Sequence, residues 1–163
     1  MTDGSWSKAK QFVVVTIRRY LAADQKAARA LIEEGLGERF GFLDRSANPD
    51  LVDIAASYAL PPNAMFVAEL HDTLVGTTAL VVQGDVGRLV RVSVARNHRR
   101  TGVATALMTY VIGFAREAGV SRLVAHTQPE WSDAMCFYER HGFIPYGRDE
   151  IDVHLHRALN SDA

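Results

Sequence analysis

The sequence has one cysteine, Cys136, among 163 residues. A single thiol cannot form a disulfide within the chain or build a zinc site from cysteines, so nothing indicates an oxidising compartment. No apolar run approaches the ~20 residues that span a membrane, and the first ten residues lack the apolar core of a signal peptide. We therefore expect a cytoplasmic protein with no membrane partner.

The net charge is also small. The chain has 18 Lys and Arg and 19 Asp and Glu, which gives a formal net charge of -1. This balance disfavours nucleic-acid binding through bulk electrostatics, so a charge-dependent function must come from a local cluster. Hydrophobic residues form 48% of the chain, enough to bury one sizeable core. We expect a single domain over residues 1–163, with residues 1–10 flexible.

Hydrophobic spacing switches repeatedly between the period of strands and the period of helices. Strands are predicted at residues 12–18, 64–70, 73–82, 88–95, 122–127, 143–146 and 151–156. Helices are predicted at residues 21–37, with Asp24 as a cap, and at residues 49–59, 103–118 and 132–141, with a loop at residues 38–48. The strand-helix-strand unit at residues 88–127 should be a parallel crossover. This order predicts an α/β or α+β fold with helices covering the faces of one sheet.

A basic stretch links the strand at residues 88–95 to the helix that follows it. It contains five arginines and no acidic residue between residues 88 and 107. A helix N-terminus offers free N–H groups and the positive end of the helix dipole, and Gly102 allows a phosphate to approach the backbone closely. On spacing alone, an anion-binding turn and a solvated surface loop explain these residues equally well.

Two motifs resemble those of the GNAT superfamily of N-acetyltransferases. Residues 99–104 read RRTGVA and resemble the Arg/Gln-x-x-Gly-x-Gly/Ala signature, while residues 137–143 read FYERHGF and are similar to the Tyr-x-x-x-Gly-Phe signature. One predicted helix, one strand and the start of another helix separate them, as in the family. The resemblance implies a mixed, mostly antiparallel sheet of about seven strands, flanked by about four helices and splayed at a central parallel pair.

The resemblance also implies acetyl-CoA as co-substrate, without a metal, and it implies which residues contact this cofactor. The backbone of Val92 and Val94 pairs with the pantetheine amides, and a turn binds the pyrophosphate through main-chain N–H groups. The residues of that turn are Arg99, Arg100, Thr101, Gly102, Val103, Ala104 and Thr105. Tyr138 stands near the sulfur as general acid. Judged without the family, Tyr138 is better interpreted as a core aromatic.

The general base is less obvious, because Arg88 stands where related sequences often have Glu and Trp131 where they often have Asn. The candidates near the ends of central strands are Glu69, Asp85, His126 and Glu130. We select His126, since imidazole titrates near neutrality. A water chain to solvent could replace all four candidates, and Trp131 is expected to line the acceptor pocket.

Three further residues have side chains that could bind a metal or react, but we assign them structural roles. His154 and His156 alternate along one predicted strand, but no third ligand accompanies them, so we expect surface residues and no metal site. Cys136 lies beside Phe137 and is expected to be a small buried hydrophobe.

The segment at residues 33–57 holds six acidic residues and two arginines. In the family, this part of the chain forms much of the acceptor pocket, and its charge contrasts with the basic stretch. The contrast fits an anionic cofactor on one side and a cationic amine on the other. Ordinary helix starts and solvated faces are the alternative explanation of these carboxylates.

These observations predict an acetyl-CoA-dependent N-acetyltransferase that acts directly on a primary amine of a small molecule or a peptide. The alternative is a non-catalytic acyl-CoA-binding or regulatory module of the same fold. Nucleic-acid binding through the arginine stretch is a third hypothesis, disfavoured by the near-neutral chain. Exposed sheet edges would also permit a homodimer.

Overall fold

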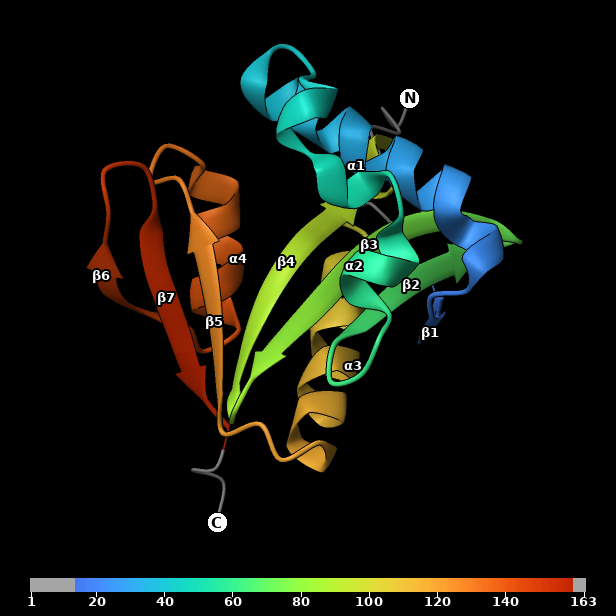
Figure 1. Cartoon of the computed structure of the whole chain (residues 1–163). Helices are drawn as coiled ribbons and strands as arrows, with labels where there is room; N and C mark the ends of the chain where they lie inside the picture. The colour runs from blue at the N-terminus through green and yellow to red at the C-terminus, as the bar shows by residue number, and fades with distance from the viewer. Residues whose placement is uncertain (1–13, 160–163) are drawn as a thin grey trace, which may run out of the picture.

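The computed structural model describes residues 14–159, so residues 1–10 and the start of the predicted strand at 12–18 lie outside the described part. Seven strands form one sheet in the order β1-β2-β3-β4-β5-β7-β6 (Figure 1). Their bounds are β1 Thr16–Arg19, β2 Ala64–Leu70, β3 Thr73–Gln83, β4 Val86–Val94, β5 Arg122–Thr127, β6 Ile144–Arg148 and β7 Val153–Ala158. Of the described strands, only β4 and β5 pair in parallel. The mixed, mostly antiparallel sheet is therefore confirmed.

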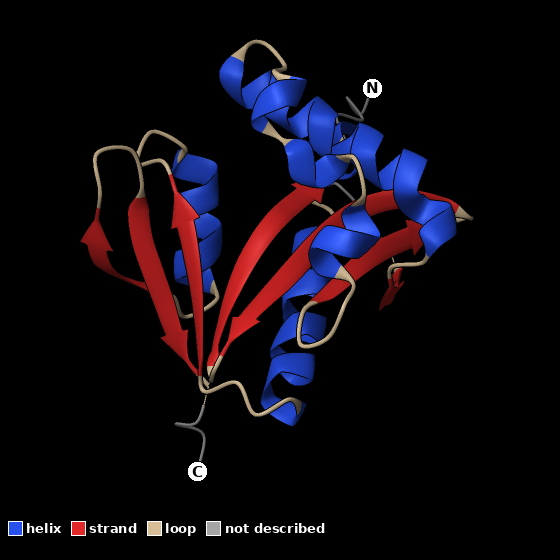
Figure 2. Ribbon diagram, viewed as in Figure 1, coloured by secondary structure: helices blue, strands red, loops and turns tan. Residues whose placement is uncertain are grey.

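Four α-helices flank this sheet, as expected (Figure 2). Their bounds are α1 Gln25–Phe40, α2 Ile54–Tyr58, α3 Val103–Glu117 and α4 Ser132–Arg140. Helices α1 and α2 cover one face of β2, β3 and β4, whereas α3 lies behind those strands and α4 behind β5 (Figure 1). No helix lies in front of β5, β7 and β6 in this view, so within the described residues that face is uncovered.

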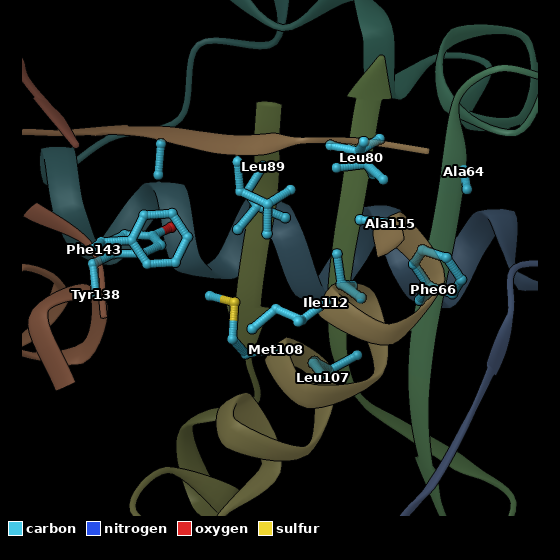
Figure 3. Packing of buried hydrophobic residues seen from close by; sticks show 14 of the residues in the cluster. Ala64, Phe66, Leu80, Leu89, Leu107, Met108, Ile112, Ala115, Tyr138 and Phe143 are labelled. Atoms are coloured by element: carbon cyan, nitrogen blue, oxygen red, sulfur yellow. The ribbon is translucent and has the colours of Figure 1, made fainter. Parts of the chain in front are cut away.

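Two hydrophobic cores hold the layers together. The larger one joins α3 and α4 to the sheet, and Figure 3 shows Tyr138 and Phe143 at one end of it and Phe66 at the other, with Leu89 and Met108 between them. The smaller core lies under α1 and α2 and includes the buried residues Ala28, Ile32, Leu51, Ile54, Met65, Val67 and Ala79. Alternate residues of a strand point to opposite faces, so β2 and β3 contribute to both cores.

The sheet opens between β4 and β5. Their pairing covers only Val86–Leu89 of β4 and residues 122–125 of β5, and the two strands diverge beyond this point (Figure 1). The register of β3 against β4 shifts between Thr77 and Ala79, which places Arg91 and its neighbour opposite one residue of β3. Such a bulge bends and twists a strand, so β4 turns away from β5, and the predicted splay is confirmed.

The boundaries of the first helix differ from the prediction. It begins at Gln25 and continues to Phe40, three residues into the expected loop, until Gly41 ends it with a φ of 76°. Asp24 occupies the N-cap position, but its side chain makes no cap hydrogen bond there. Its carboxylate instead accepts from the backbone N–H of Leu21 and from both terminal nitrogens of Arg18. The strong ion pair therefore replaces the cap interaction.

We expect Gly76→Ala to destabilise the protein by about 1–3 kcal/mol, because an added Cβ would overpack the contact between β3 and α3. It would lie 2.9 Å from Leu107 Cδ1 and 2.9 Å from Val103 Cγ1, in the first turns of α3. Gly113→Ala is the matched control, since a Cβ at that exposed helical position meets nothing within 4 Å and should stabilise the helix by about 0.5–1 kcal/mol. Urea denaturation measures both changes. Equal stability of the two variants would contradict the tight contact of β3 with α3.

Candidate active site

The turn before α3 has the backbone geometry of an anion-binding site. Arg100 and Gly102 have φ angles of 61° and 92°, and the Thr101 hydroxyl donates to the carbonyl of His98. Among residues 14–159, no side chain caps α3. The N–H groups of its first turn, those of Val103, Ala104 and Thr105, therefore lack helical partners. Together with the helix dipole they favour a negatively charged group at this position.

The edge of β4 that faces the opening carries the two valines assigned to the cofactor. Ser93 pairs with Thr77, and the N–H of Ala95 donates to the carbonyl of Val75. Because backbone groups alternate along a strand, those of Val94, which lies between Ser93 and Ala95, face away from β3, and Val92 lies at the bulge beside it. This edge can accept a strand-like ligand.

Arg99 already contacts this edge. Its Nε donates to the carbonyl oxygen of Val94 at 3.2 Å, and its Nη1 donates to Glu38 Oε2 at 2.6 Å. Arg96 Nε donates to the other oxygen, Oε1, at 3.2 Å. The hydrogen bond from Arg99 and the positive charges of Arg99 and Arg96 lower the pKa of Glu38. The carboxylate of Glu38 therefore occupies the basic turn as an anion that belongs to the chain itself. Sequence spacing did not reveal this contact.

The next two residues of α1 reach the other side of the opening. Arg39 forms two hydrogen bonds with Asp133 of α4, at 2.8 and 2.7 Å, and its guanidinium lies 4.7 Å from the centre of the Trp131 ring. Phe40 meets the same ring edge to face at 5.4 Å. The α1 end, which we define as Glu38, Arg39 and Phe40, thus contacts both the turn after β4 and the start of α4.

A small cavity lies between β3, β4, α3 and α4. Its volume is about 10 Å³, space for about one water molecule. It is lined by Thr78, Leu89, Val92, Ala104, Leu107, Met108, Val111 and Phe137. The structure therefore brings two predicted cofactor residues, Val92 and Ala104, together with the residue that precedes Tyr138.

Tyr138 is the buried residue of α4, with 7% of its surface exposed. Its ring packs edge to face against Phe137 and Phe143. Burial raises the pKa of Tyr138 to about 12, so the hydroxyl stays protonated at any working pH. Tyr138 is thus a core aromatic on the helix that borders the opening, and its role as general acid stays a prediction.

His126 lies on the uncovered face of β5. Its strand neighbour Ala125 belongs to the core under α4, so His126 points to the opposite face, the side on which α1 and α2 lie. Burial, then the charge of Arg88 and the neighbouring His154, lower the pKa of His126 below its ordinary value. The imidazole is therefore neutral at pH 7 and able to accept a proton.

The other three base candidates lie in structural positions. Glu69 accepts from Arg18 Nε at 2.7 Å on the β1–β2 side of the sheet. Asp85 accepts from the hydroxyl of Ser121 at the end where β4 and β5 are still paired. Glu130 is exposed in the connection between β5 and α4. His126 therefore fits the role of base better than these three.

The acidic segment does not form an open negative surface. Glu33 and Glu38 pair with arginines, and so does Asp50, while Asp44 and Asp53 accept from backbone N–H groups at the starts of helical turns. Three of the six carboxylates are thus balanced by arginines and two lie at the starts of helical turns, as the alternative explanation expected, whereas Glu34 is exposed. The argument from charge for a cationic acceptor is therefore weakened.

Asp50 takes part in a cluster that sequence analysis missed. Arg91 has a φ of 54° at the bulge, and two of its nitrogens donate to Asp50 at 2.9 and 2.7 Å. Tyr58 donates to the same carboxylate at 2.5 Å. Burial disfavours the charge, but the hydrogen bonds from Arg91 and Tyr58 lower the pKa of Asp50 overall. The cluster links the segment between α1 and α2 to β4. Asp50 and Arg91 lie 41 positions apart in the sequence, so no local pattern predicted their contact.

Two assignments of isolated residues need comment. Cys136 is exposed, not buried, because it precedes Tyr138 by two positions and so lies about 200° around the helix from that buried side chain. His154 and His156 are half-buried rather than fully on the surface. Residues 14–159 hold no group of three metal-ligating side chains, and no helix among them has the length and apolar character needed to cross a membrane.

Sequence comparison identifies the family. The pattern of the Acetyltransferase (GNAT) family matches residues 32–143, so the chain belongs to this family. It is 37% identical over 114 residues to the probable N-acetyltransferase camello of Xenopus tropicalis, covering 67% of this chain and 52% of that protein. N-acetyltransferase 8B of Homo sapiens is 35% identical over 119 residues, with coverage of 69% and 52%. The chain thus spans about half the length of these curated relatives.

Solved structures show the same fold. A GNAT-family acetyltransferase from Staphylococcus aureus Mu50 aligns with a TM-score of 0.82 at 21% identity, covering 90% of this chain and all of that one. The PaiA N-acetyltransferase from Thermoplasma acidophilum, in complex with coenzyme A, gives a TM-score of 0.78 at 13% identity, with coverage of 90% and 99%. The splayed sheet with four helices is therefore the fold of this family.

Proposed function

We propose that the protein is an acetyl-CoA-dependent N-acetyltransferase that acetylates a primary amine of a small molecule or a peptide. The observation that carries this proposal is the uncapped start of α3, whose positive-φ turn adjoins the unpaired edge of β4. Free N–H groups and a helix dipole suit a pyrophosphate, and the edge at Val92 and Val94 suits the pantetheine amides. The names of the relatives and the coenzyme A complex of the PaiA enzyme support the same activity.

Acetyl-CoA would supply the acetyl thioester, and the residues of the chain would handle the protons. His126 accepts the proton that the amine loses as its nitrogen bonds to the acetyl carbon. The sulfur leaves with the electrons of the broken C–S bond. Tyr138 donates a hydrogen bond to it, because a phenol with a pKa of about 12 is a weaker acid than a thiol of ~8.5 and does not readily give up its proton.

An amine panel tests the activity. We expect thiol release with acetyl-CoA and at least one polyamine, amino acid, aminoglycoside or short peptide, at a rate that rises from pH 6 to pH 8 because the attacking nitrogen must be neutral. Gly102→Asp should abolish release, since an acidic side chain at a φ of 92° disturbs the turn and repels phosphate. Acetyl-CoA binding without release for any amine would favour the non-catalytic module.

Glu38→Gln should tighten coenzyme A binding by about 2- to 5-fold, because it removes the carboxylate that competes with phosphate for Arg96 and Arg99. Titration calorimetry at low and high salt measures the change, which should shrink as salt screens the charges. The control is Glu34→Gln, the same charge change one turn earlier on α1. Weaker binding in Glu38→Gln alone would show that Glu38 orients the arginines instead of competing.

Tyr138→Phe should lower turnover about 10- to 100-fold, because it removes one hydrogen bond to the charged leaving sulfur, worth about 1.5–3 kcal/mol, while coenzyme A affinity stays constant. Folding stability should change little, since the substitution keeps the ring and its edge-to-face contacts with Phe137 and Phe143. Tyr110→Phe, the same change on the exposed side of α3, is the control. Unchanged turnover in Tyr138→Phe would leave this residue a core aromatic only.

A further inference from the structure

The ring of His126 is stacked on a second imidazole. His126 and His154 are register partners on β5 and β7, and their ring centres lie 3.9 Å apart with only 8° between the planes. Both side chains lie on the face opposite α4, because Ala125 and Leu155 occupy the core face. A parallel contact this close restricts the plane in which the His126 ring can lie.

His154 is itself held in place by the turn between β6 and β7. His154 Nε2 lies 2.8 Å from Asp149 Oδ2. The other oxygen, Asp149 Oδ1, accepts from the backbone N–H groups of Ile151 at 2.8 Å and Asp152 at 2.7 Å. The hydrogen bonds from the Asp152 backbone and from His154 lower the pKa of Asp149, so the carboxylate is ionised at neutral pH. A fixed carboxylate selects one ring orientation of its histidine partner.

The charged groups around His126 come from three parts of the chain. Arg88 faces it from β4, His154 faces it from β7, and Asp149 and Asp152 approach from the turn before β7. Positive charge on Arg88 or His154 disfavours a proton on His126, and the two carboxylates favour one. Any change at His154 should therefore be visible in the titration of His126.

We propose that His154 and Asp149 are positioning residues that orient the imidazole of His126 for proton transfer. Asp149 fixes His154, and the stacked ring of His154 then fixes His126 on the face where the amine acceptor would approach. The proposal rests on the proposed function, in which His126 is the base. The next residue pair along the same strand provides a contrast, because His156 meets the ring of Tyr146 at 4.8 Å and opposes Val124 of β5, not His126.

The test compares His154→Phe, which keeps a flat ring, with His154→Ala, which removes it, and with His156→Phe as the matched control. We expect kcat to fall about tenfold in His154→Ala, a part of what a general base contributes, with partial rescue in His154→Phe and no change in His156→Phe. KM for the amine should stay constant in all three variants. Loss of the neighbouring imidazole should also move the acid limb of the kcat profile upward by about 0.5 pH unit in both His154 variants.

A titration of the His126 ring by NMR makes the proposal independent of turnover. Its midpoint should rise by the same ~0.5 pH unit in both His154 variants and stay constant in His156→Phe. An unchanged midpoint in His154→Ala overturns the positioning role, even if the enzyme is active. Full turnover in His126→Gln overturns the base assignment in the proposed function instead, so the two failures are distinguishable.

Discussion

The bulge at Arg91 is the constraint on which the candidate site depends. It places two residues of β4 opposite one of β3, which turns β4 away from β5 just after their last pair. The positive φ of Arg91 costs free energy for a residue with a side chain, but Asp50 binds its guanidinium and the Thr77 hydroxyl donates to its carbonyl. These bonds, one from the segment between α1 and α2 and one from the neighbouring strand β3, hold β4 in its bent shape at the opening.

The α1 end places a second constraint on the same opening. Consecutive residues of one helical turn reach the basic turn through Glu38 and the start of α4 through Arg39 and Phe40. An anion that binds at Arg96 and Arg99 must compete with Glu38, and the helix that carries Glu38 also contacts Trp131. In the proposed function, cofactor binding at these arginines and the position of Trp131 on the acceptor side would thus be linked through a single helix terminus.

Local patterns predicted the parts of the fold that depend on local chemistry. The strands at Ala64–Leu70 and Arg122–Thr127 have the predicted bounds, because alternating and continuous apolar runs decide burial directly. The turn at Gly102 could also be predicted, because its motif is a short run of consecutive residues. The Arg91–Asp50 pair and the Glu38 contacts were not, since they join residues 41 to 61 positions apart and no periodicity reports such distances. Cys136 was misplaced because a helix of nine residues buries few side chains, and its neighbour Phe137 gave no direction around the axis.

The two residues proposed to act on the amine and on the sulfur lie on opposite sides of the sheet. His126 projects from β5 to the face where α1 and α2 lie, whereas Tyr138 packs with α3 and α4 in the core of the other face. The gap between β4 and β5 connects these faces only because the strands stop pairing after Leu89 and Ala125. In the proposed function, an amine that enters from the α1 side and a sulfur held on the α4 side would therefore meet at the backbone of β4. A closed sheet with the same two residues would keep acceptor and donor apart, so the chemistry depends on the splay as much as on either side chain.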